Sequence, residues 1–412
     1  MKLTYAHTRW ACNLGIICQA CNNNLPPLLF IVFQNAYGIS YERLGRLILL
    51  NFATQLVVDV VAARYADKIG HRAVMVASEA LSAAGLLIIA ASPVLPIPMY
   101  GGLACGVVVS AIGGGLLEVM VSRISDALPA DSSKKAANMA LLHSFYCWGQ
   151  VAVVAISTFF LLVVGQSRWQ LLPIIWVALP LTALALFAKS PFADIPEHEI
   201  TMGMSNLFKT PLFWAAMIMM ACAGASEITV SQWSSLFAEK GLGLAKVSGD
   251  LAGPCLFAVM MGIGRTFYGL RGAKINLKPF IAVSAGLCVA SYLTISFSPN
   301  PVLSLAGCAI CGLSVSVMWP GTLSLGAEKF RSGGTAMFGL FAMCGDIGCA
   351  AGPWLAGFAA ESAANGGAWA RIGAVLFTGA GVELRAGILL GILFPVAMLA
   401  TVPMFRDNFT RK

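Results

Sequence analysis

The sequence predicts an all-α integral membrane protein in which twelve transmembrane helices form two six-helix bundles. Of the 412 residues, 58% are hydrophobic and only 11% are charged, whereas a soluble domain carries about 25% charged residues. The apolar residues also fall into runs of about 20, the length that crosses a bilayer core as a helix. A charged, hydrophilic stretch near the middle of the chain divides these runs into two equal sets.

The apolar runs predict spans at residues 12–36, 44–64, 73–92, 98–123, 136–164, 170–188, 212–237, 249–270, 279–297, 302–325, 334–360 and 384–405. The first run contains three consecutive asparagines and lacks the form of a cleaved signal peptide. We therefore expect it to remain in the protein as the first span.

The longest hydrophilic connection is residues 189–210, KSPFADIPEHEITMGMSNLFKT. Its prolines and clustered charges are typical of a linker. It predicts an N-terminal six-helix bundle over 1–188, a cytoplasmic linker over 189–210 and a C-terminal six-helix bundle over 211–412.

The basic residues predict the orientation, because Lys and Arg are enriched in cytoplasmic loops. Of the 26 Lys and Arg residues, 19 fall in the terminal segments and even-numbered loops. The other side of the membrane holds Arg43, Arg46, Arg168, Lys240, Lys246, Arg371 and Arg385. We expect a multi-pass protein of the cell (inner) membrane with both termini cytoplasmic. The net charge of +8 then reflects orientation in the lipid bilayer, and no nucleic-acid partner is expected.

No motif of an enzyme stands out in the sequence. It has no phosphate-binding loop, no long soluble domain and no His pair at metal-ligand spacing. The 12 cysteines are scattered through apolar spans, and small buried cysteines are common packing residues. We expect no catalytic residue, no metal, no disulfide and no cofactor, and a monomer.

The loop after the second span carries a recognisable motif. Residues 63–72, ARYADKIGHR, place Asp67, Gly70 and Arg72 in a short basic turn. The segment resembles the loop motif of the major facilitator superfamily, although Ala63 replaces the leading glycine of that motif. The resemblance implies a transporter that works by alternating access, with this loop latching one state.

A weaker echo follows the eighth span. Residues 262–274, GIGRTFYGLRGAK, again combine small residues with Arg, and we assign Arg265 to the gating motif with the first loop. Parallel repeats of six spans are a known transporter architecture, with the substrate site at the interface near the midplane.

Glu118 is the most informative residue, because it lies in an otherwise uncharged apolar run. The segment 113–121, GGGLLEVMV, resembles the fourth span of the fucose-permease-like sugar:proton symporters, in which the Glu takes part in proton coupling. Glu227 lies in 225–237, ASEITVSQWSSLF, which resembles the seventh span of that branch. The alternative for Glu118 is an ion pair with Arg123.

Two further titratable residues are candidates for proton coupling. His143 lies in residues 138–150, NMALLHSFYCWGQ, which resemble the fifth span of the same branch. Asp346 lies on the glycine-rich eleventh span and either pairs with Arg265 or lines the gate. Asp59 and Glu79 are also embedded, and we expect structural roles for both.

Polar and aromatic residues inside the spans are candidates for substrate binding, because amides and aromatic rings suit a hydroxylated solute. They are Asn22, Asn23, Asn24, Gln55, Gln150, Gln232, Trp233 and Trp319. The alternative role for the asparagines is hydrogen bonding between helices. The alternative for Gln232 and Trp233 is a place in the aromatic belt at the membrane surface. The asparagines resemble the first span of fucose permeases, but Pro26 and Pro27 stand where that family continues to an Asp.

These features favour a secondary active transporter of a small polar solute, a sugar or related compound, by proton symport. The alternative is efflux of a drug or metabolite by proton antiport, since such carriers share the loop motif and also use embedded carboxylates. An organic-anion carrier is disfavoured, because no Arg other than Arg265 falls in mid-span.

Overall fold

The computed structural model describes residues 3–129, 132–193, 207–271, 275–330, 334–366, 368–377 and 381–405. Residues 194–206 of the predicted linker lie outside these ranges, so the linker over 189–210 stays a prediction. The N-terminal half consists of α1 (Tyr5–Leu28), α2 (Phe30–Tyr37), α3 (Tyr41–Ile69), α4 (His71–Ala91), α5 (Met99–Ala127), α6 (Ser132–Val164), α7 (Leu171–Trp176) and α8 (Ala178–Lys189).

The C-terminal half is also helical. It consists of α10 (Pro211–Leu236), α11 (Lys246–Asp250), α12 (Leu256–Arg271), α13 (Leu277–Phe297), α14 (Pro301–Val315), α15 (Met318–Lys329), α16 (Gly334–Ala364), α17 (Ala368–Leu376), α18 (Val382–Leu390) and α19 (Leu393–Thr401). Among these, α17 was not predicted, and its 9 residues are too few to span a bilayer.

The predicted spans are confirmed. Within the described ranges, 11 helical segments are long and apolar enough to cross a membrane. The remaining predicted span, 334–360, is α16, a helix of 31 residues that Asp346 and Pro353 make less apolar. The first span is 94% buried in its most apolar window and the seventh 83%, against 33% for the last. These two spans are therefore central, and the last is peripheral.

Prolines explain why several spans consist of two helices. A proline lacks the amide that would bond to the carbonyl four residues earlier. The break between α14 and α15 begins at Ser316, four residues before Pro320, and that between α18 and α19 at Gly391, four before Pro395. The first span breaks at Leu29, directly after Pro26 and Pro27.

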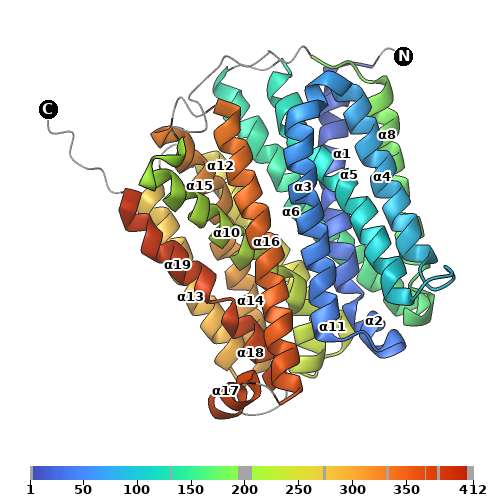
Figure 1. Cartoon of the computed structure of the whole chain (residues 1–412), viewed down its shortest axis with the longest axis vertical. Coiled ribbons are helices and arrows are strands. Elements are labelled where there is room, and N and C mark those ends of the chain that lie inside the picture. The colour runs from blue at the N-terminus through green and yellow to red at the C-terminus, as the bar shows by residue number, and fades with distance from the viewer. Residues whose placement is uncertain are drawn as a thin grey trace, which may run out of the picture.

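The two bundles lie side by side (Figure 1). The first bundle contributes α1, α3 and α6 to the interface, and the second contributes α10, α12 and α16. Helix α3 packs on α16, and α6 packs on α12. The start of α1 and the end of α19 lie toward the same face, the upper one in Figure 1. We call this the terminal face, and the opposite one the distal face.

The bundles are joined in their distal halves. Five inter-bundle hydrogen bonds between described residues lie there: Gln232 to the Asn23 carbonyl, Gln150 to Ser231, Thr158 to Asp250, Lys240 to Asn35 and Lys246 to the Leu28 carbonyl. Trp233 of α10 adds edge contacts to Phe30, with ring centroids 5.9 Å apart. The structure is therefore closed toward the distal face.

Asp250 is the centre of the distal closure. It is fully buried, and its carboxylate accepts hydrogen bonds from Thr158 at 2.9 Å and from Ser235. Lys246 lies 3.1 Å from the same carboxylate and also donates to the Leu28 carbonyl at 3.0 Å. One carboxylate thus ties α10 and α11 to α1 and α6 across the interface.

We expect Asp250→Ala to weaken this closure. The substitution leaves Lys246 without its carboxylate in a site with little water, and breaking a buried ion pair in this way costs about 3–5 kcal/mol. Thr158→Val is the matched control, because it removes one hydrogen bond, worth about 1 kcal/mol. Thermal unfolding in detergent measures both, and hydrogen exchange in α11 is expected to rise in Asp250→Ala. Equal stability of the two variants would contradict this role.

Candidate functional site

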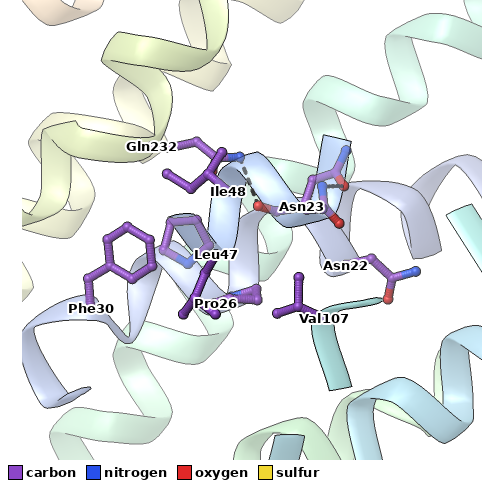
Figure 2. A pocket seen from close by; sticks show the side chains of 10 residues that line it. Asn22, Asn23, Pro26, Phe30, Leu47, Ile48, Val107 and Gln232 are labelled. Carbon is purple, nitrogen blue, oxygen red and sulfur yellow. Dashed lines mark hydrogen bonds between the residues drawn. The ribbon is translucent and has the colours of Figure 1, made fainter. Parts of the chain in front are cut away.

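The asparagines of α1 lie at the bundle interface, within a network of amides (Figure 2). The side-chain oxygen of Asn23 accepts hydrogen bonds from Asn51 at 3.0 Å and from Gln55 at 3.1 Å, and its amide nitrogen donates to the Tyr146 hydroxyl at 3.3 Å. Asn22 instead donates to Ser82 at 2.9 Å, inside the first bundle. The Asn23 side chain thus joins α1 to α3 and α6, whereas the Asn22 side chain joins α1 to α4.

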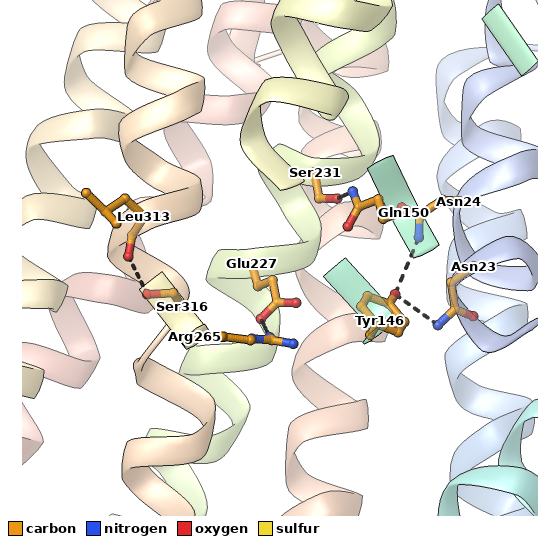
Figure 3. Close-up of polar contacts among 9 residues, drawn as sticks. All are labelled: Asn23, Asn24, Tyr146, Gln150, Glu227, Ser231, Arg265, Leu313 and Ser316. Carbon is orange, nitrogen blue, oxygen red and sulfur yellow. Dashed lines mark hydrogen bonds and ion pairs between the residues drawn. The ribbon is translucent and has the colours of Figure 1, made fainter. Parts of the chain in front are cut away.

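Asn24 lies beside this network. Its amide donates to the Ala20 carbonyl at 2.8 Å and lies 3.5 Å from the Tyr146 hydroxyl. Tyr146 thus contacts two neighbouring asparagines of α1, as Figure 3 shows.

The backbone of Asn23 also reaches across the interface. Because Pro27 has no amide hydrogen, the carbonyl four residues earlier has no helical partner. That carbonyl belongs to Asn23, and it accepts a hydrogen bond from Gln232 of α10 at 2.9 Å. The prolines that replace the family's acidic residue therefore free a backbone acceptor for an inter-bundle contact.

Glu118 is linked to the same network through Gln19. The Gln19 amide nitrogen donates to Glu118 at 3.4 Å and to Gln55 at 2.9 Å. Hydrogen bonds thus run from Glu118 through Gln19 and Gln55 to Asn23. The alternative ion pair of Glu118 with Arg123 is not the contact that positions this carboxyl.

Three consecutive glycines let α5 approach three helices at once. A Cβ on Gly113 would lie 2.5 Å from the Ser78 carbonyl of α4, one on Gly114 would overlap the Gln19 side chain of α1, and one on Gly115 would lie 3.0 Å from Val58 of α3. The segment that resembles the fourth span of the sugar symporters therefore positions Glu118 by close packing.

Glu227 and Arg265 form an ion pair with a distance of 2.8 Å between Oε2 and Nη2 (Figure 3). Their side chains are 8% and 13% exposed, so the pair is largely shielded from water. Arg265 lies inside α12, which continues to Arg271, in agreement with its place in the predicted span 249–270. Of the two alternatives for Asp346, no ion pair with Arg265 is found among the described residues, where the carboxylate paired with Arg265 is that of Glu227.

The first bundle contributes polar groups near this ion pair. Cys147 of α6 lies beside Arg265, and His143 and Tyr146 lie close enough to feel the charges of Arg265 and Glu227 respectively. His143 is exposed, with its Nε2 3.4 Å from the Ser122 hydroxyl. One face of α6 therefore runs between the asparagines of α1 and the ion pair of the second bundle.

Gln150 and Trp233 mark the distal end of the site. Gln150 donates to Ser231 across the interface at 2.8 Å. The indole nitrogen of Trp233 donates to the Pro353 carbonyl at 3.0 Å, and the ring is 2% exposed. The pocket in Figure 2, between Asn23, Gln232 and Phe30, has space for about one water molecule. Trp233 thus takes part in the closure.

Asp346 and Trp319 lie further toward the terminal face. The Asp346 side chain of α16 is within hydrogen-bonding distance of Asp59 of α3. Trp319 lies directly against the backbone of Gly345, the residue before Asp346.

The loop motif holds neighbouring helices together at the terminal face. Gly70 separates α3 from α4 with a φ of 95°, which favours glycine. Arg72 donates to the Ala188 carbonyl at 2.6 Å at the end of α8, where a cation suits the helix dipole. The Asp67 side chain lies outside the described residues.

The family of the chain follows from this fold and a sequence comparison. A family model described as Major Facilitator Superfamily matches residues 12–353. The chain belongs to the major facilitator superfamily. It is therefore a multi-pass membrane transporter of small-molecule substrates and not an enzyme, and its fold works by alternating access.

Solved structures share this fold over nearly the whole chain. A D-xylose-proton symporter matches with a TM-score of 0.76 and 13% identity, over 98% of this chain and 99% of that one. A bacterial homologue of the human lysosomal transporter Spinster, inward-facing and occupied, matches with a TM-score of 0.73 and 14% identity, over 98% of this chain and 97% of that one. An Escherichia coli fucose:proton symporter variant matches with a TM-score of 0.66 and 17% identity, over 98% of this chain and 99% of that one. No curated protein sequence matches.

Sequence reasoning missed three members of the network: Gln19, Asn51 and Tyr146. Helical spacing offered a signal, because residues four apart share a face. Gln19 and Asn23 have this spacing, and so do Asn51 and Gln55.

We expect Gly114→Ala to disturb the contact between Gln19 and Glu118. The added methyl group overlaps the Gln19 amide, so α1 and α5 must separate or the amide must turn away. Overpacking of this kind costs about 1–3 kcal/mol. Gly101→Ala is the matched control on the same helix, since its Cβ would meet nothing closer than 3.9 Å. Thermal unfolding compares the two, and equal melting temperatures would contradict the close packing.

Proposed function

We propose that this protein is a secondary active transporter that takes up a small polar solute, a sugar or a related compound, together with a proton. The observation that carries this proposal is the hydrogen-bonded connection between Glu118 and the amides at the bundle interface. It links a group that can bind a proton to groups that can bind a hydroxylated solute.

The side chains at the interface favour a neutral polar solute. Asn23, Gln232, Gln150 and Tyr146 offer amide and hydroxyl groups, each of which can donate and accept. Arg265 is the mid-span cation, and Glu227 balances its charge, so the pair offers an anion no net attraction. Two of the structures with this fold are named as fucose:proton and D-xylose-proton symporters, which supports the same class.

Glu118 is the proposed coupling residue, and its protonation would be felt through the amides. As a carboxylate it accepts from Gln19. As a neutral acid it donates instead, and the buried oxygen of Gln19, which has no hydrogen-bond partner, is the acceptor at hand once that amide turns. The oxygen of Asn51 is also unpartnered. A rotation begun at Gln19 can thus pass to Gln55 and from there to Asn23, because each amide is the hydrogen-bond partner of the next.

The remaining candidates complete the cycle. Glu227, His143 and Asp346 are proposed as further groups that respond to the proton, and Asn22, Asn24, Gln55 and Trp319 as groups that shape the substrate site. Asp67, Gly70 and Arg72 are proposed to hold the terminal ends of the first bundle in one gating state. Trp233 is proposed to close the distal side over the solute.

The distribution of basic residues supports a cytoplasmic terminal face in the cell membrane, with the linker 189–210 on that side. With this orientation, the distal closure shuts the site from the outer side of the membrane. A monomer with one site between its two bundles, 1–188 and 211–412, suffices for this cycle.

The solute class is tested with a ligand panel on the purified protein. At about 100 times its Kd, a ligand adds about 2.7 kcal/mol of stability, so a sugar substrate is expected to raise the melting temperature by several degrees. Gln232→Ala is expected to abolish that rise. Stabilisation by lipophilic drugs and by no sugar would favour efflux by proton antiport instead.

The coupling role of Glu118 is tested by Glu118→Gln, which keeps the size and polarity of the side chain but cannot bind and release a proton. In proteoliposomes this variant is expected to lose uptake driven by a pH gradient, while exchange of labelled for unlabelled solute continues. Glu328→Gln, an exposed site on α15, is the control and is expected to keep both activities. Gradient-driven uptake at the wild-type rate in Glu118→Gln would remove Glu118 from the mechanism.

A further inference from the structure

Two carboxyl groups from different bundles meet where α3 packs on α16. Asp59 is 8% exposed and Asp346 is 2% exposed. Their side chains lie within hydrogen-bonding distance of each other. The sequence predicts a structural role for Asp59, and in the structure its partner is a second acid.

The contact is incomplete unless it holds a proton. Oδ1 of Asp59 and Oδ2 of Asp346 are both buried, and neither has a hydrogen-bond donor. Two ionised carboxylates about 3 Å apart in a shielded site repel too strongly to coexist, whereas one shared proton turns the repulsion into a hydrogen bond. A carboxyl pair of this kind titrates as a unit.

The surroundings favour a proton over a metal ion. Glu118 of α5 is a further acid that interacts electrostatically with Asp59 and Asp346, and the Cys349 thiol lies one turn beyond Asp346 on α16. Within the described residues, no three His, Cys, Asp or Glu side chains are arranged to hold a metal. Trp319 of the second bundle packs on Gly345, the residue before Asp346.

The Asp59–Asp346 pair lies in the contact between α3 and α16, which we call the seam. At the distal end of this seam, a Cβ on Gly45 of α3 would lie 3.5 Å from the backbone of Pro353 and Trp354 of α16. Asp59 follows Gly45 by fourteen residues, about 21 Å along the helix toward the terminal face. Movement that parts α3 from α16 at this level would expose both carboxyls to water, where each can ionise.

We propose that Asp59 and Asp346 form a second proton-binding site, shared between the bundles and distinct from Glu118, that holds α3 to α16 while the proton is bound. The site rests on the proposed proton coupling of the transporter, but it makes its own prediction. Loss of the shared proton loosens the seam between the bundles whether or not substrate is present.

The test uses the purified full-length protein without substrate. The melting temperature of the wild type is expected to fall by several degrees between about pH 6 and about pH 9, because deprotonation leaves two like charges in contact. Asp59→Asn and Asp346→Asn are each expected to remove most of that fall, since the new amide donates a hydrogen bond to the remaining carboxylate at every pH. Glu79→Gln is the control for a buried acid away from the seam. Both Glu79 oxygens are buried without a donor in the first bundle, so this variant removes only the titration of Glu79 and is expected to keep the part of the fall that the aspartate variants remove.

Infrared spectroscopy supplies a direct reading of the proton. The wild type and Glu79→Gln are expected to share a carbonyl band of a protonated carboxylic acid near neutral pH that is missing from both Asp59→Asn and Asp346→Asn. Persistence of that band in either variant, or a pH dependence of melting that neither variant reduces, would overturn the proposal. Stabilisation of the wild type by sodium ions, absent in both variants, would replace the proton with a cation.

These readings separate the two proposals. Glu118→Gln leaves both aspartates in place, so it is expected to lose gradient-driven uptake while keeping the pH-dependent melting of the seam. A loss of both would show that Glu118 and the aspartates form one site.

Discussion

Polar groups between the two bundles have to find their partners within the protein, because lipid offers none and water is scarce at this depth. This constraint accounts for the chain of amides from Gln19 to Asn23, in which each side chain satisfies the next. It also accounts for the ion pair of Glu227 with Arg265, since either charge alone would be costly to bury. Where the constraint is not met, as at Asp59 and Asp346, a bound proton is the simplest completion.

Close backbone packing is what allows so many polar contacts in a small space. The three glycines before Glu118 each admit a different helix, so α5 lies against α4, α1 and α3 within one turn. A side chain at Gly114 would displace Gln19, and Glu118 would lose its connection to the interface. The glycines and the carboxyl therefore act as one feature, and the sequence signature combines a packing requirement with a chemical one.

Much of the fold could be predicted from the sequence, because apolar runs of sufficient length identify spans and prolines identify their breaks. Within the site, the sequence singled out Glu118 and Asn23 but did not predict the partners that Arg265 and Asp346 have, Glu227 and Asp59. Those partners depend on which sides of the helices meet across the interface, and no local sequence pattern contains that information. Tyr146 was missed for a related reason: a single phenol in an apolar helix is equally suited to lipid, core or cavity.

The prolines of the first span show how a departure from a family pattern can preserve a function by other means. Pro27 removes the amide that would have satisfied the Asn23 carbonyl, and Gln232 of the opposite bundle takes its place. The same residue thus uses its side chain for the network that reaches Glu118 and its backbone for the distal closure. A change in the protonation of Glu118 that turns the Asn23 amide would act on the residue that also joins the bundles. The proposed coupling between proton and conformation therefore needs no acidic residue in the first span, because the helix break joins Asn23 to the opposite bundle.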